Sequence, residues 1–114
     1  MQLYNTLSAE ERAQLIDEAG KHRLTLSFYA YAKIEDPKKF RDDLFIQWNQ
    51  LDALGRTYVA KEGINAQMSV PAENFEAFRE TLEAYEFMRG IRLNVAVEHD
   101  DHSFLKLTVK RITF

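Results

Sequence analysis

The sequence contains no cysteine among its 114 residues. Disulfide bonds, thiolate catalysis and cysteine-bound metals are therefore excluded for this chain, and the absence is consistent with a reducing compartment. No apolar run approaches the roughly 20 residues that a membrane-spanning helix requires. Residues 1–7 lack a basic stretch followed by an apolar one, so they do not resemble a secretory signal. We therefore expect a cytoplasmic protein that does not enter a membrane.

The chain also lacks an excess of positive charge, internal repeats and low-complexity segments. Lys and Arg number 15 against 18 Asp and Glu, which gives a formal net charge of −3. No overall positive field draws such a chain to nucleic acid, although a local basic patch remains possible. Hydrophobic residues make up 46% and charged residues 29%, as is typical of a globular protein. A chain of this length can bury one sizeable core, so we expect one main domain.

Helical periodicity predicts a short amino-terminal helix and two longer helices. Ser8 and Glu11 form a capping-box pattern at the start of the first helix. The second begins at Asp36-Pro37, where the aspartate caps the helix and the proline takes its first position. The third covers about residues 72–85. Each of the two longer helices carries one apolar stripe, which indicates that one side of it packs against a core.

Alternation of apolar and polar residues predicts four core strands. The first covers residues 23–33, two more follow Gly55 and form a hairpin around Glu62-Gly63, and the fourth covers residues 91–97. After the first helix the order is thus β-α-β-β-α-β, which is the split βαβ pattern of ferredoxin-like and acylphosphatase-like α+β folds. We expect a four-stranded antiparallel sheet with both longer helices on one face.

The sequence suggests a division of the chain into three parts. Residues 1–22 form an amino-terminal helical extension, residues 23–103 the ferredoxin-like domain, and residues 104–114 an extended segment. The last segment alternates apolar and basic residues and ends at Phe114. Natural termini are more often polar and frayed. We therefore expect further chain to follow in the natural protein.

The outward face of the predicted sheet is the first candidate functional surface. RNA-binding sheets of this kind stack bases on aromatic side chains and place basic groups against phosphates. The alternative is that the face packs on another domain or is merely hydrated, and no recognisable RNP aromatic motif is present. A second candidate overlaps with it, because a glycine turn beside cations and an amide can bind an anion. The residues of these two candidates are Tyr29, Tyr31, Arg56, Tyr58, Lys61, Glu62, Gly63, Asn65 and Gln67, with Arg92 and Asn94 on the last core strand.

Three other sequence patterns are weaker candidates for a functional site. An acylphosphatase requires an arginine in a glycine-rich loop after the first strand, whereas residues 32–36 here contain neither residue type. The run 98–102 offers histidines and carboxylates, but such a run is more typical of a hydrated turn, and we predict no metal site. Lys38, Lys39 and Arg41 cluster at a helix start, where such clusters are usually hydrated. We expect neither acylphosphatase activity nor a cofactor.

Several segments together resemble the amino-terminal domain of the YceA/TrhO group, which are rhodanese-domain tRNA uridine-34 hydroxylases. The most specific segment is residues 55–71, which read G-R-x-Y-x-A-x-E-G-I-N-A-Q-x-S-V-P. Residues 27–31, the Asp36-Pro37 pair and residues 91–94 are also similar to the group. The similarity spans nearly the whole chain from Thr25 to Val109.

The resemblance implies that the parent protein hydroxylates carbon 5 of the wobble uridine of certain tRNAs with molecular oxygen. It also implies that a rhodanese domain carrying the essential cysteine follows Phe114, and that this chain holds no catalytic residue. The chain would then be an accessory domain, inactive alone, that positions tRNA or braces the rhodanese domain. The expected partners are tRNA and that rhodanese domain. The alternative is a stand-alone protein-interaction module with an open sheet face.

Overall fold

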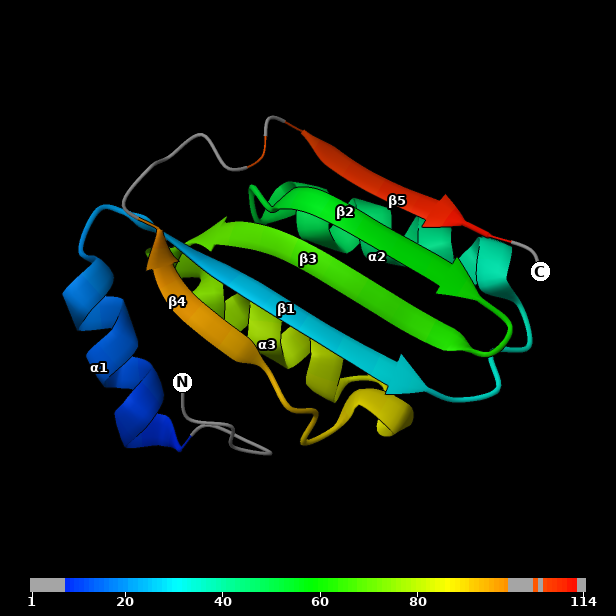
Figure 1. Ribbon diagram of the computed structural model, residues 1–114, viewed down its shortest axis with the longest axis horizontal. Helices are drawn as coiled ribbons and strands as arrows, with labels where there is room; N and C mark the ends of the chain where they lie inside the picture. Colours follow the sequence, from blue (N-terminus) through cyan, green and yellow to red (C-terminus); the bar gives the residue numbers. More distant parts are fainter. Residues whose placement is uncertain (1–7, 99–103, 105, 113–114) are drawn as a thin grey trace.

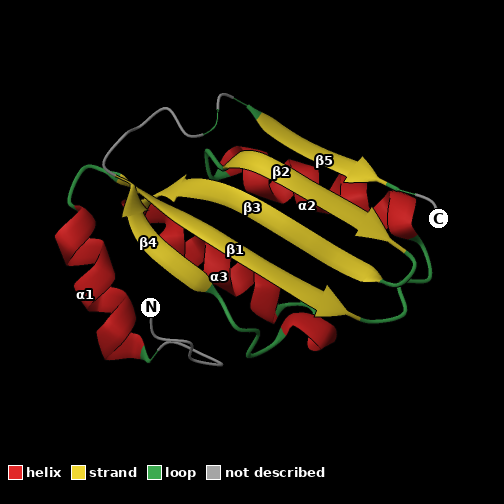
Figure 2. Cartoon of the chain, in the orientation of Figure 1, coloured by secondary structure: helices red, strands yellow, loops and turns green. Residues whose placement is uncertain are grey.

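The computed structural model of the chain describes residues 8–98, 104 and 106–112. They form two layers, a sheet and a pair of helices behind it, as Figure 2 shows. In chain order the helices and strands are α1 (Ala9–Ala19), β1 (Arg23–Tyr31), α2 (Pro37–Gln50), β2 (Leu54–Ala60), β3 (Gly63–Pro71), α3 (Phe75–Glu83), β4 (Asn94–Glu98) and β5 (Leu107–Arg111). Short 3-10 turns, Ala72–Asn74 and Glu86–Met88, precede and follow α3.

The sheet has the strand order β4-β1-β3-β2-β5. Strands β1 to β4 pair in antiparallel fashion, in the order expected of a split βαβ fold. Helices α2 and α3 both lie on the same face of this sheet (Figure 1). The predicted α+β class and the placement of both longer helices on one face are therefore confirmed.

The fifth strand corrects the prediction of a four-stranded, wholly antiparallel sheet. β5 runs parallel to β2 and pairs with its outer edge. The N–H of Gly55 donates to the carbonyl of Lys106, and the N–H of Ile112 donates to the carbonyl of Val59, both over 2.8 Å. An edge strand presents a row of unpaired N–H and C=O groups, and β5 supplies partners for those of β2.

The apolar side chains of β5 explain why this segment joins the sheet. Val109 is 2% exposed and belongs to the core, and Leu107 packs against that core. The segment 104–114, expected as an extended run leading out of the domain, thus contributes a strand over residues 107–111. The division of the chain at residues 22 and 103 stays a prediction.

The hairpin turn between β2 and β3 lies one residue earlier than the sequence suggested, at Lys61-Glu62 instead of Glu62-Gly63. Ala60 pairs with Gly63, so Lys61 and Glu62 form the turn and Gly63 already belongs to β3. Gly63 has a φ of +152°, and a Cβ at this position would lie 2.1 Å from the carbonyl oxygen of Ala30. Only glycine allows β1 and β3 to approach this closely.

The core fills the space between the sheet and the two helices. Trp48 of α2 is fully buried, and its Nε1–H donates to Oγ1 of Thr81 on α3 over 3.0 Å. The edge of one ring meets the face of the other where Trp48 lies against Phe28, with centroids 6.4 Å apart. The largest fully buried residues are Trp48, Phe75, Phe78, Leu24, Leu44, Met68, Leu82 and Met88.

Helix α1 lies beside β4 at one end of the domain (Figure 1). Its capping box is formed as predicted, because the N–H of Glu11 donates to Oγ of Ser8 and the N–H of Ser8 donates to the Glu11 carboxylate. Nε of Arg12 lies 2.7 Å from the carboxylate of Glu76, which ties α1 to α3. Within the described chain, no helix is long and apolar enough to span a membrane.

Candidate functional site

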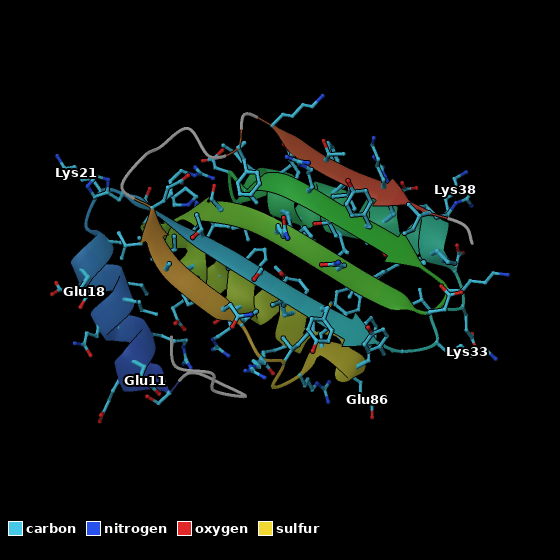
Figure 3. The ribbon with its side chains drawn as sticks, viewed as in Figure 1. Glu11, Glu18, Lys21, Lys33, Lys38 and Glu86 are labelled. Carbon is cyan, nitrogen blue, oxygen red and sulfur yellow. The ribbon has the colours of Figure 1, made fainter. Side chains whose placement is uncertain are left out.

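The face of the sheet turned away from α2 and α3 is open, and its side chains stand toward the viewer in Figure 3. Three tyrosines project from it: Tyr29 is 63% exposed, Tyr31 is 84% exposed and Tyr58 is 37% exposed. Arg56, Asn65 and Gln67 are exposed there as well. The alternation along β1, β2 and β3 thus places these predicted residues together on one surface, which we call the open face.

The strand register arranges the open face in rows that cross the sheet. Asn65 of β3 pairs with Tyr29 of β1 on one side and with Tyr58 of β2 on the other. Tyr58 in turn pairs with Lys110 of β5. Neighbouring strands lie about 4.8 Å apart. One row therefore presents an aromatic ring, an amide, a second aromatic ring and an ammonium group in close succession.

The next row along the strands is polar. Gln67 pairs with Ser27 on one side and with Arg56 on the other, and Arg56 pairs with Thr108 of β5. A smaller hollow of about 90 Å³ lies between the two rows, lined by Arg56, Tyr58, Asn65 and Gln67. The guanidinium group and two side-chain amides can all donate hydrogen bonds there.

An aromatic hollow of about 370 Å³ opens on the hairpin end of the open face. Tyr29 and Tyr31 stand on one side of it, with their rings in edge-to-face contact at a centroid distance of 5.6 Å. Gly63 and Ala60 are opposite each other in the hairpin, and because both residues are small they leave space at the bottom of the hollow. The lining residues are Tyr29, Ala30, Tyr31, Tyr58, Ala60, Glu62, Gly63, Ile64, Asn65 and Ile112. Its volume lies at the lower end of the range of small-molecule pockets, which is about 300–1,000 Å³.

Positive charge gathers on the open face although the chain as a whole is acidic. Arg56, Lys106 and Lys110 are exposed, and no hydrogen bond or ion pair engages their side chains within the described residues. On the helix-covered side, α3 carries three glutamates and one arginine. The open face therefore offers free cations next to aromatic rings, which is the combination that nucleic-acid surfaces use.

Sequence reasoning missed the contribution of β5 to this surface. Lys110 of β5 pairs with Tyr58, Lys106 precedes the strand, and Ile112, which follows it, lines the aromatic hollow. The signal was present, because Lys106, Thr108 and Lys110 alternate with apolar residues. What the alternation does not reveal is which strand β5 joins.

The other predicted residues lie at the borders of the open face. Lys61 and Glu62 are exposed in the hairpin turn, and Glu62 also lines the aromatic hollow. Asn94 pairs with Ser27 on the side of β4, so it lies outside both hollows. Arg92 precedes β4 and is half-buried, and it is not part of either hollow. The structure therefore does not bring Arg92 and Asn94 together with the tyrosines.

Two backbone N–H groups of the loop between β1 and α2 are already hydrogen-bonded, so they cannot bind a phosphate as the loop of an acylphosphatase does. The N–H of Ala32 donates to the carbonyl of Glu62 over 3.0 Å, and the N–H of Ile34 donates to the carbonyl of Lys61 over 2.9 Å. Both donors are thus used to fasten the loop to the hairpin. An acylphosphate would need such amides free to meet its oxygens.

The cationic cluster at the start of α2 is largely engaged in the fold. Nζ of Lys39 donates to the carboxylate of Asp43 over 2.7 Å, and this hydrogen bond raises the pKa of Lys39. Arg41 lies against Asp42 and donates to the carbonyl of Val109. These two side chains are therefore already paired within the fold, which makes them weaker candidates for phosphate binding than the cations of the open face.

The metal-binding pattern considered for residues 98–102 lies mostly outside the described residues. Glu98 closes β4 and its carboxylate lies 4.0 Å from Nε of Arg23. Among the residues that the structure describes, no group of three or more histidine and acidic side chains is arranged to hold a metal.

A larger hollow of about 570 Å³ lies at the other end of β2, near the start of β1 and β5. Arg23 lines it, but its guanidinium group donates to Oγ and the carbonyl of Ser69 and to the carbonyl of Asp52. This arginine fastens the strands to the loop after α2. The hollow is therefore a weaker candidate for ligand binding than the open face.

Comparison with known proteins gives consistent matches. Residues 23–112 match the family described as UPF0176 acylphosphatase like domain. Proteins named tRNA uridine(34) hydroxylase are similar to the chain. The one from Pectobacterium carotovorum is 49% identical over 110 residues, which are 95% of this chain and 31% of that protein. The one from Leptospira interrogans is 41% identical over 108 residues, which are 95% of this chain and 29% of that protein.

A further relative of the same name, from Escherichia coli O127:H6, is 46% identical over 110 residues, again 95% of this chain and 31% of that protein. The chain therefore spans about three tenths of the length of the curated relatives it matches. The resemblance that residues 55–71 carry most specifically is thereby confirmed.

Proposed function

Because the chain belongs to the family of UPF0176 acylphosphatase-like domains, we propose that it is the amino-terminal accessory domain of a tRNA uridine(34) hydroxylase. Relatives with that name are about three times as long as the chain. The chain contains no cysteine. We therefore assign oxygen-dependent hydroxylation of the uridine to a rhodanese domain elsewhere in the parent protein, which acts in the cytoplasm on its tRNA substrates.

The role of the domain in this proposal is to position tRNA through its open face. The observation that carries it is the gathering of Tyr29, Tyr58 and Arg56, joined by Lys106 and Lys110, on the face that the helices leave uncovered. Tyrosine rings supply stacking surfaces for unpaired bases, and the cations neutralise phosphates. No step of the chemistry is assigned to these residues. They hold the RNA while the catalytic domain acts on the wobble uridine.

The test is RNA binding by a variant that alters the open face alone. Tyr29→Ala, Arg56→Ala and Tyr58→Ala are combined, and binding to an anticodon stem-loop is measured by fluorescence anisotropy. We expect a loss of affinity of about tenfold or more, since each lost base stack alone is worth about 1–3 kcal/mol. Wild-type affinity should also fall as salt rises.

The matched control is Lys38→Ala, which removes an exposed cation of α2 away from the open face (Figure 3). Circular dichroism and thermal melting check that the triple variant is folded. We expect it to fold because its three altered side chains are exposed. Unchanged RNA binding in a folded triple variant would remove the RNA role from this face.

A second candidate function is the bracing of a protein partner, either the rhodanese domain or a separate protein. The observation that favours it is that exposed Tyr31 and, on the opposite side, Ile112 both line the hollow and add apolar area at its rim. It predicts that the open face is protected from solvent when the domain is joined to the rest of its enzyme. Hydrogen exchange of β2 and β3 in the chain alone and in the longer protein, both without RNA, separates the two functions.

A further inference from the structure

We propose that the two adjoining hollows of the open face form a site for one unstacked nucleotide of single-stranded RNA, with its base in the aromatic hollow and its phosphate at Arg56. This inference rests on the proposed function and deepens it, because it states how the RNA lies on the face. It depends on the shapes of the two hollows, on the polar groups inside them and on the charges around them.

The aromatic hollow has the form that a single base requires. Tyr29 and Tyr58 stand on the two strands that flank Asn65, so their Cα atoms are two strand spacings apart, or about 9.6 Å. A flat base between two rings needs about 7 Å from ring to ring at ordinary contact distances, and each ring can tilt inward. The tyrosines therefore leave room for one base and not for a stack.

The bottom of the hollow is shaped by two small residues. Gly63 and Ala60 pair with each other, and Tyr31 pairs with Gly63 on the far side. A larger side chain at Gly63 is excluded by the backbone of Ala30. The hollow is thus a consequence of the hairpin geometry and is present without a ligand.

Asn65 supplies the polar contact that fixes the orientation of a base. Its side chain lines both hollows and is exposed. No hydrogen bond within the described chain engages its amide, which leaves one acceptor and two donors. An asparagine amide can pair with the edge of a base through one donor and one acceptor. A base held between the tyrosines meets this amide at the floor.

The charges determine which way the nucleotide points. Glu62 lines the hairpin end of the aromatic hollow and repels a phosphate there. Arg56 lines the smaller hollow at the other end, two residues along β2 from Tyr58, and this separation is about 6.7 Å. A phosphate is separated from its own base by the width of a sugar, which matches that spacing. Lys110 on the neighbouring β5, and Lys106 just before that strand, lie on the path of the following phosphates.

The experiment compares two labelled RNA oligomers of equal charge in binding to the 114-residue chain. One is a fluorescein-labelled uridine hexamer, and the other has the same phosphates and sugars but abasic positions. We expect the hexamer to bind at least about fivefold more tightly, since base stacking on an aromatic ring contributes about that factor or more. In Asn65→Leu the preference should shrink, while the abasic oligomer should bind as it does to the wild type.

The matched control is Asn94→Leu, which changes an asparagine of the same open face that lies outside both hollows. It should retain the full preference for the hexamer. The side-chain amide signals of Asn65, assigned in an NMR spectrum by their loss in Asn65→Leu, should shift when the hexamer is added.

The outcomes separate this inference from the proposed function. Equal binding of both oligomers to the wild type, together with binding of the anticodon stem-loop, overturns the base site and leaves tRNA positioning through phosphates standing. An unchanged preference in Asn65→Leu overturns the role of the amide. Failure of the chain to bind either oligomer or the stem-loop overturns both proposals.

Discussion

The Nε–H of Arg41 on α2 donates a hydrogen bond of 2.7 Å to the backbone carbonyl of Val109 on β5. The same guanidinium lies over the ring of Phe45, 5.1 Å from its centroid. β5 is an edge strand that pairs with β2 alone. Arg41 thus provides the edge strand with a second attachment, from the helix layer to the strand that carries Lys110.

Arg41→Ala should therefore loosen β5 more than it weakens the rest of the domain. We expect a loss of about 1–2 kcal/mol in the free energy of unfolding, because a hydrogen bond from a charged donor is removed at a half-exposed site. Hydrogen exchange of the Ile112 amide should accelerate, since its bond to Val59 reports on the pairing of β5 with β2. Lys38→Ala, an exposed change on the same helix, should alter neither quantity.

Gly63 provides a test of the hairpin geometry. Gly63→Ala should destabilise the domain by about 3 kcal/mol or more, because its positive φ and its contact with the carbonyl of Ala30 both oppose a Cβ. Gly20→Ala is the matched control. Its φ is +57°, and a Cβ there meets nothing within 4 Å. Only the conformational cost of about 1–3 kcal/mol should remain, because the ψ of Gly20 is −111° and few L-residues adopt this combination of angles. Urea unfolding of both variants gives the comparison, and equal losses would contradict the close approach at Gly63.

Much of the open face could be predicted because alternation in a strand has a fixed period. Once Leu24, Leu26 and Phe28 are assigned to the core, Tyr29 and Tyr31 must point the other way or lie at its border. The capping box of α1 and the apolar stripe through Trp48 could also be predicted from the sequence, because both depend on local spacing.

The neighbours of β5 could not be predicted in the same way. Its alternation states which side chains face the core but contains nothing about which edge the strand joins or in which direction it runs. That choice depends on the free edge of β2 and on the contact between Arg41 and Val109, residues that are 68 positions apart in sequence. The rows that combine Tyr58 with Lys110 and Arg56 with Thr108 therefore emerged only from the structure.

Thr57, which is buried, and Thr81, which is half-buried, should respond oppositely to the same substitution. Oγ1 of Thr81 accepts the Nε1–H of Trp48 over 3.0 Å, whereas Oγ1 of Thr57 is buried with no hydrogen-bond partner among the described residues. Thr81→Val should cost about 1–3 kcal/mol, because the indole N–H is left buried and unpaired.

Thr57→Val should be neutral or stabilising by up to about 1 kcal/mol, since a methyl group replaces a buried hydroxyl that makes no hydrogen bond. Thermal unfolding of the two variants measures the difference directly. A destabilisation of Thr57→Val as large as that of Thr81→Val would show that the Thr57 hydroxyl is satisfied in solution.

The salt dependence of RNA binding should report how many phosphates the cations of β5 neutralise. For single-stranded RNA, the logarithm of the binding constant falls with the logarithm of salt concentration by about 0.7 per phosphate neutralised. The double variant Lys106→Ala and Lys110→Ala should therefore reduce the steepness of this dependence by about 1.4. Lys21→Ala combined with Lys38→Ala removes the same charge from places away from the open face (Figure 3), and it should leave the slope unchanged. If both double variants reduce the slope equally, the RNA is responding to the net charge of the domain, and β5 has no special part in holding the phosphates.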